Sequence, residues 1–114
     1  MIILMISVKA RSNKRNELLS TLRTITDQTR QEEGCEGYRV SLDIDSEDLI
    51  YLEESWERRS YLDAHFHSDI FSALLGSVKF LGENHAIQIN ECSTIGGVEA
   101  IQEARQRKNR EISE

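Results

Sequence analysis

Two side chains with acid and base chemistry, Glu54 and His65, stand in the middle of the chain. Glu54 lies two residues before Trp56, the only tryptophan, in the stretch YLEESW. Side chains alternate along a strand, so Glu54 shares a face with apolar residues. An unpaired buried carboxylate would be costly or would take up a proton. Glu54 is therefore either a structural acceptor of hydrogen bonds or part of a buried site, and the sequence leaves both interpretations open.

Two histidines flank Phe66, and only one of them can face the interior. His65 follows Leu62 by one helical turn and shares its inward side, whereas His67 lies about 200° round the helix and faces outward. An inward histidine serves either as a core residue or in proton transfer. Glu54 and His65 offer two ligands to a metal, with no third at a recognisable spacing. A defined transition-metal site needs more, so we predict no metal site.

The composition limits the class of protein. A chain of 114 residues forms one ordinary domain, and a net charge of −6 argues against nucleic acid as a partner. The opening MIILMISVKA is apolar over only eight residues, which is too short for a membrane span and wrong for a signal peptide. Cys35 and Cys92, the only cysteines, are expected to be reduced thiols. We therefore expect a cytoplasmic protein with no membrane partner.

Apolar periodicity predicts the strands and helices that position these side chains. Alternating or continuous apolar residues predict strands at 2–9, 38–45, 49–57 and 86–92. A helix is expected over 13–33, with Ser12 or Asn13 as its cap. Ser60 opens a capping-box pattern for a second helix, and Ser68 can cap a third, so the helical region is expected to bend near Ser68.

The order β-α-β-β-α-β predicts an α+β fold, a ferredoxin-like antiparallel sheet with its main helices on one face. Leu49 and Tyr51 lie on the other, open face, which is apolar enough to predict packing against a second copy with two-fold symmetry. A charged helix with a weak apolar stripe follows the last strand. We expect a domain over residues 1–96 and a C-terminal helical extension over 97–114.

Three segments, GCEGYRVSLD, YLEESW and DAHFHSDIF, resemble the antibiotic biosynthesis monooxygenase domain, a family of dimeric α/β barrels that includes small quinol monooxygenases. The matching residues are Gly34, Cys35, Gly37, Tyr38, Glu54, Trp56, Ala64, His65 and Ser68. The likeness covers about residues 1–92. Haem-degrading relatives use an asparagine on the first strand, and IILMISVK has none.

The resemblance implies a homodimeric monooxygenase that oxidises a small aromatic substrate such as a quinol without a cofactor, in a pocket between the sheet and its helices. His65 would be the base and Glu54 would orient it. The substrate would be bound by Tyr38, Trp56, Phe66 and Phe71. Two alternatives stay open: an isomerase or other proton-transfer enzyme acting on a small hydroxyketone through the same pair, and a non-catalytic dimeric binding module.

Overall fold

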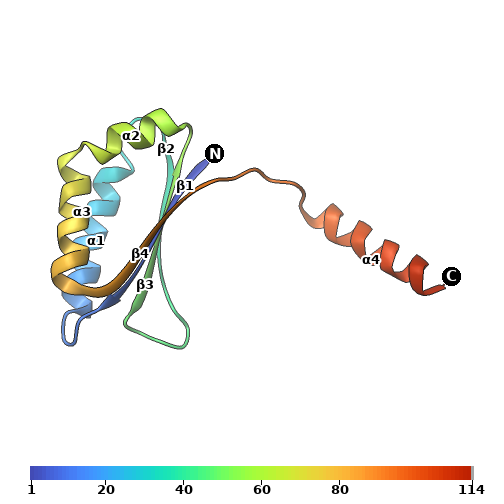
Figure 1. Cartoon of the computed structure of the whole chain (residues 1–114), viewed down its shortest axis with the longest axis horizontal. Coiled ribbons are helices and arrows are strands. Elements are labelled where there is room, and N and C mark those ends of the chain that lie inside the picture. Colours follow the sequence, from blue (N-terminus) through green and yellow to red (C-terminus); the bar gives the residue numbers. More distant parts are fainter. Residues whose placement is uncertain (114) are drawn as a thin grey trace.

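The computed structural model describes the backbone of residues 1–113 and the side chains of residues 1–107. Its elements are β1 (Ile2–Ala10), α1 (Arg15–Thr29), β2 (Cys35–Leu42), β3 (Leu49–Trp56), α2 (Arg59–Phe66), α3 (Asp69–Leu81), β4 (Gly82–Glu91) and α4 (Val98–Ser113). The strands form one antiparallel sheet in the order β2-β3-β1-β4. Helices α1, α2 and α3 cover one face of that sheet (Figure 1). The predicted ferredoxin-like α+β fold is confirmed.

The covered face is the core because alternate strand residues are apolar and point at the helices. Leu4, Ile6 and Val8 of β1 and Ile50 and Leu52 of β3 are buried. The helices contribute residues at a helical spacing, which are Leu18, Leu22 and Ile25 of α1 and Leu74 and Val78 of α3. Each such side chain contributes roughly 1.5–3 kcal/mol of burial free energy. This layer encloses the two candidate acid and base residues.

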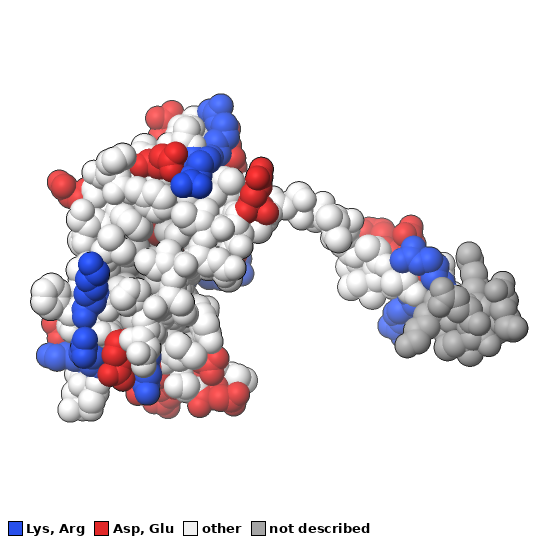
Figure 2. Space-filling view, viewed as in Figure 1, with Lys and Arg blue, Asp and Glu red and all other residues white. Residues whose placement is uncertain are grey.

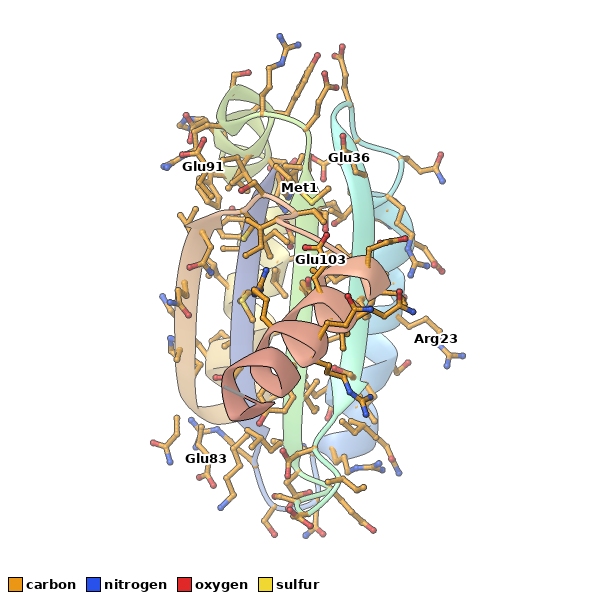
Figure 3. The ribbon with its side chains drawn as sticks, turned by 90° about the vertical axis from the view of Figure 1, so that its right-hand side faces the viewer. Met1, Arg23, Glu36, Glu83, Glu91 and Glu103 are labelled. Carbon is orange, nitrogen blue, oxygen red and sulfur yellow. The ribbon has the colours of Figure 1, made fainter. Side chains whose placement is uncertain are left out.

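The second face of the sheet carries no helix in the single chain. Figure 3 looks onto this face, with α4 in front of it. Met5 and Tyr51 lie here with 44% and 38% of their surfaces exposed. The sequence predicts that the first strand is buried on both sides. In the single chain, β1 is buried only on the side that the helices cover. A shallow cavity of about 410 Å³ on this face is lined by residues that include Met5, Ser7, Tyr51 and Gln88.

Two predicted helix starts are wrong. Asn13 has a φ of 65°, a left-handed value incompatible with a helix, so α1 begins at Arg15 and has no side-chain cap. Ser60 lies inside α2, which begins at Arg59 without a side-chain cap. The third start is confirmed, since the Ser68 hydroxyl accepts a hydrogen bond from the Phe71 amide at 3.2 Å. α2 and α3 are accordingly separate helices that meet at Ser68.

Helix α1 ends at Thr29, four residues earlier than predicted, and the segment that follows is central to the site. Gly34 has a φ of +83°, and a Cβ at this position would overlap the ring of Tyr61 on α2. The Gly34 carbonyl also accepts a hydrogen bond from the Glu57 amide at 2.9 Å. Glycine therefore lets the chain turn back beneath α2. Glu32, two residues before this turn, lies beside the interior side of α2.

Helix α4 stands clear of the sheet and the other helices, on the side of the open face (Figure 1). Residues 92–97 connect it to β4 without regular structure. Val98 and Ile101 of its weak apolar stripe are 65% and 62% exposed. In the view of Figure 2, acidic and basic side chains are interspersed over the body and neither sign forms a continuous patch. No helix in the described part of the chain is long and apolar enough to cross a bilayer.

Candidate functional site

His65 lies in the last turn of α2 and points into the core with 1% of its surface exposed. Leu62, one turn earlier, is fully buried beside it, whereas His67 is exposed. The predicted division between an inward and an outward histidine is therefore confirmed. Glu54 of β3 is also fully buried and lies between Leu52 and Trp56 on the covered face. Sheet and helix thus bring the two candidate residues together.

The imidazole ring of His65 lies between two carboxylates. Its Nδ1 is 2.6 Å from Oε2 of Glu32, and its Nε2 is 3.2 Å from Oε1 of Glu54. Both pairs are within ion-pair distance, although neither has the directionality of a hydrogen bond. The same Oε1 of Glu54 accepts a hydrogen bond from Nε1 of Trp56 at 3.0 Å. Both ring nitrogens thus face acceptor atoms.

This arrangement favours protons on the ring. A neutral imidazole has one N–H and turns a lone pair toward one of the two carboxylates. Burial lowers the pKa of His65, but Glu54 and then Glu32 raise it by more, and the net shift is upward from 6.5. The two carboxylates therefore make His65 a better proton acceptor than a free imidazole. One imidazole in contact with two carboxylates can accept and pass on protons.

Tyr38 and Thr26 extend the buried polar cluster. The Tyr38 hydroxyl, Oγ1 of Thr26 and Oε2 of Glu54 are buried and have no hydrogen-bond partner of ordinary geometry among the described residues. Burial, followed by the Glu54 charge, raises the pKa of Tyr38 far above 10, so its hydroxyl stays protonated and can donate. Buried polar atoms are normally paired. These atoms suit a ligand hydroxyl or an ordered water.

Aromatic side chains pack directly on the His65 ring. The ring centroids of Trp56 and Phe71 lie 4.8 and 5.2 Å from it, and Phe66 packs on Phe71 with centroids 4.8 Å apart. Trp56 and Phe71 therefore contact the imidazole, and Phe66 packs on Phe71; their binding of a substrate stays a prediction. They also fill much of the space in which the sequence predicts a pocket, because Trp56 is fully buried and Phe71 is 8% exposed.

One cavity lies beside Thr26. It measures about 500 Å³, lies between α1 and β2, and is lined by Leu19, Arg23, Thr26, Asp27, Arg30, Val40 and Leu42. Another of about 150 Å³, lined by Gly37, Tyr38, Arg39, Glu53 and Ser55, lies on the open face, on the other side of the sheet from the cluster. The Thr26 and Tyr38 hydroxyls are close enough for Thr26 to affect the pKa of Tyr38. The larger cavity therefore ends next to the buried polar cluster.

The family model of the antibiotic biosynthesis monooxygenases matches residues 1–75, about two thirds of the chain. The chain belongs to the antibiotic biosynthesis monooxygenase family. Glu54, Trp56, His65 and Tyr38 all fall within the matched part of this family member. A search of the curated proteins finds no match to the sequence.

Solved structures share the fold of this antibiotic biosynthesis monooxygenase family member. A candidate antibiotic biosynthesis monooxygenase from Deinococcus radiodurans is 24% identical with a TM-score of 0.78, and the match covers 86% of this chain and 98% of that one. A protein from Mycobacterium tuberculosis is 22% identical over 84% of this chain and 98% of that one, with a TM-score of 0.75. A conserved protein from Methanosarcina mazei is also 22% identical, over 81% and 92%, with the same TM-score of 0.75.

Glu32 is the residue of the site that sequence reasoning misses. The predicted helix over 13–33 includes Glu32 without giving it a role, whereas it lies beyond the true end of α1. The signal in the sequence is its spacing, because Glu32 follows Ile25 by two helical turns and so shares the inward side of the predicted helix. Glu32 and Glu54 approach opposite nitrogens of the ring, so they do not converge on one ion. No cluster of metal-binding side chains occurs within the residues that the structure describes.

Proposed function

We propose that this family member is a cofactor-independent monooxygenase that oxidises a small phenol or quinol with dioxygen. The observation that carries the proposal is the position of His65 between two carboxylates, one of which keeps a free buried oxygen. A phenolate reacts with dioxygen more readily than a phenol, so the protein must supply a base in an apolar site. The cluster combines a proton acceptor with aromatic surroundings.

The reaction balances without an external reductant. A hydroquinone supplies all four electrons that dioxygen takes up: one oxygen atom enters the ring and the other leaves as water. The product is a hydroxyquinone. The protein need only remove the phenolic proton, hold the ring and exclude bulk water.

The roles follow from the geometry. The first acceptor is Oε2 of Glu54, because this oxygen is buried without a hydrogen-bond partner, and His65 takes the proton onward. The protonated Tyr38 hydroxyl donates a hydrogen bond to a substrate oxygen. Trp56 and Phe71 form the apolar surroundings of His65, Phe66 packs on Phe71, and the substrate ring enters from the cavity between α1 and β2. The 500 Å³ cavity is large enough for a single ring and leads to Thr26 beside Tyr38.

We further propose that the protein is a homodimer whose two copies pack together through the open faces of their sheets. Met5 and Tyr51 would be removed from water. Burial of the open face against a second copy should remove on the order of 2,000 Å² or more, the scale of an obligate homodimer. We expect folding and association to be coupled.

Oxygen consumption tests the oxygenase proposal. The protein is assayed against a panel of hydroquinones in an oxygen electrode, with an anaerobic sample beside it. His65→Ala should reduce turnover by roughly 10²–10⁴-fold, whereas His67→Ala, two residues away and exposed, should not. Turnover that persists without dioxygen, or quinol that is not consumed with it, would show that the protein is not an oxygenase.

A second candidate is a proton-transfer enzyme, for example an isomerase acting on a small hydroxyketone. The observation in its favour is the position of His65 within ion-pair distance of two glutamates, a group that can serve as both acid and base. Solvent deuterium would enter the substrate ketone in an isomerase and not in the oxygenase.

The close packing of Trp56 and Phe71 on His65 favours a third candidate, a non-catalytic binding module. Binding of a quinol without oxygen uptake or label exchange would identify it.

A further inference from the structure

Glu32 connects the buried cluster with solvent. Its side chain is 28% exposed, whereas those of His65 and Glu54 are 0% and 1% exposed. Its Oε2 atom is nonetheless buried and lies 2.6 Å from Nδ1 of His65. One carboxylate therefore has a buried oxygen against the imidazole and a surface that water can reach.

We propose that Glu32 is a positioning residue that keeps His65 protonated on Nδ1 and passes protons between the buried pair and solvent. Its role in turnover rests on the proposed function, whereas its hold on His65 does not. Neither the sequence motifs nor the family match assigns a role to this residue.

The relay conserves protons at each step. The substrate hydroxyl gives its proton to Oε2 of Glu54, leaving a phenolate. In this step the Nδ1 proton of His65 faces Glu32, and Nε2 turns its lone pair toward Glu54. His65 takes the Glu54 proton on Nε2 and gives its Nδ1 proton to Glu32, which releases a proton to water. The reverse transfers later return one proton from solvent to the oxygen that leaves as water, which restores the proton on Nδ1. One proton leaves the substrate and one enters solvent, with no change in the charge of the cluster.

The surroundings of the ring leave the two glutamates as its charged neighbours. From β2, Cys35 and Tyr38 lie near the cluster, and burial raises the pKa of both, so both are neutral. From α3, Phe71 packs on the ring without charge. Arg30, which follows the last residue of α1, donates a hydrogen bond from its guanidinium to the Tyr38 carbonyl at 2.8 Å. Its Nη1 atom lies 3.8 Å from Oδ1 of Asp27. Within the described residues, Glu32 and Glu54 are therefore the charges that contact His65.

Nuclear magnetic resonance titration of the histidine ring signals tests the contact without any substrate. Glu32→Gln should lower the pKa of His65 by roughly 1–3 units, because it removes an opposite charge in direct contact. The matched control is Glu33→Gln, the same change at the exposed neighbouring residue, which should leave that pKa unchanged. An unaltered His65 pKa in Glu32→Gln would overturn the proposal. So would an equal shift in the control.

Chemical rescue tests the transfer of protons. Glu32→Ala removes the carboxylate that passes protons to solvent, so turnover of the quinol should fall at least about tenfold. The substitution also opens a path from solvent to Nδ1, so turnover should recover as formate is added. Formate should not accelerate the wild type or Glu33→Ala. The KM for the quinol should stay constant, since Glu32 is not placed against the substrate. A lowered His65 pKa without rescue would leave Glu32 as a fixed charge and overturn the relay.

The two experiments separate this inference from the proposed function. If the titration behaves as expected but no quinol is consumed, the oxygenase proposal fails and the contact stands. If quinol is consumed and Glu32→Ala turns over at the wild-type rate, the relay fails and the oxygenase proposal stands.

Discussion

Strand β3 carries two glutamates in succession that meet opposite environments. Glu54 faces the helices, is fully buried and contacts His65 and Trp56. Glu53 faces the open side of the sheet, is partly exposed and lies opposite Arg39 of β2 in the register. The two residues have the same side chain and are neighbours on the same strand. One carboxylate nevertheless lies in an apolar layer and the other at an accessible surface. Position relative to the covering helices, rather than residue type, determines which carboxylate can belong to a site.

The largest expected difference between the two faces is in stability. Glu54→Ala removes the partner of a buried His65 and the acceptor of the Trp56 indole, which should cost about 3–5 kcal/mol of the free energy of unfolding. Glu53→Ala should change it by less than about 0.5 kcal/mol. Thermal or urea unfolding of both variants at one protein concentration measures the contrast. Equal destabilisation by the two changes would contradict the distinction drawn between the faces.

A charge introduced on the open face should weaken the association of two copies. Tyr51→Glu places a carboxylate in the proposed interface and should weaken dimerisation by roughly 100-fold or more. Phe80→Glu is the matched control, because Phe80 is 82% exposed on α3, away from this face. Sedimentation of both variants over a dilution series reports the association. A wild-type chain that is already monomeric at micromolar concentration, with a thermal midpoint independent of dilution, would rule out the dimer.

The covered face should make stability depend on pH in one direction. The pKa of His65 is raised in the folded state, because the two glutamates outweigh burial, so the folded protein holds this proton more tightly than the unfolded chain. That contribution is complete below about 6.5 and is lost as pH rises through the folded pKa. The slope should reach at most about 1.4 kcal/mol per pH unit. Unfolding measured from pH 6 upward in the wild type and in His65→Asn should show this slope only in the wild type, since His67 and His85 are exposed.

The smallest effect is expected from removing α4. A chain ending at residue 96 should keep its thermal midpoint within about 2 °C, because α4 stands apart from the body in Figure 1 and an isolated helix of this length is marginal in water. This result would support the division into a domain over 1–96 and an extension over 97–114. A large loss of stability would instead mean that α4 packs against the body of its own chain or of a second copy.

Part of the site follows from the sequence because it depends on local periodicity. Alternation along β3 places Glu54 and Trp56 on one face, and one helical turn from Leu62 places His65 inward. The Ser68 cap is likewise local chemistry. The fold follows from the order of the elements.

Other features depend on contacts between distant segments, which no local pattern encodes. Glu32, in the segment after α1, meets His65 of α2, which lies far later in the chain. The closeness of Trp56 and Phe71 to the imidazole depends on how the core side chains pack. Such packing decides whether a carboxylate lies at one ring nitrogen or at each of them. The tendency of the ring to hold a second proton depends on this arrangement.

The contact between Trp56 and His65 has an optical consequence. Trp56 is the only tryptophan, and the centroids of the two rings lie 4.8 Å apart with an angle of 32° between their planes. A cationic imidazole that close to an indole quenches its fluorescence more strongly than a neutral one does, because the cation interacts with the electron-rich ring. All tryptophan fluorescence of the chain therefore comes from a residue at the centre of the covered face. Its brightness at each pH is an intrinsic, label-free indicator of the charge held there.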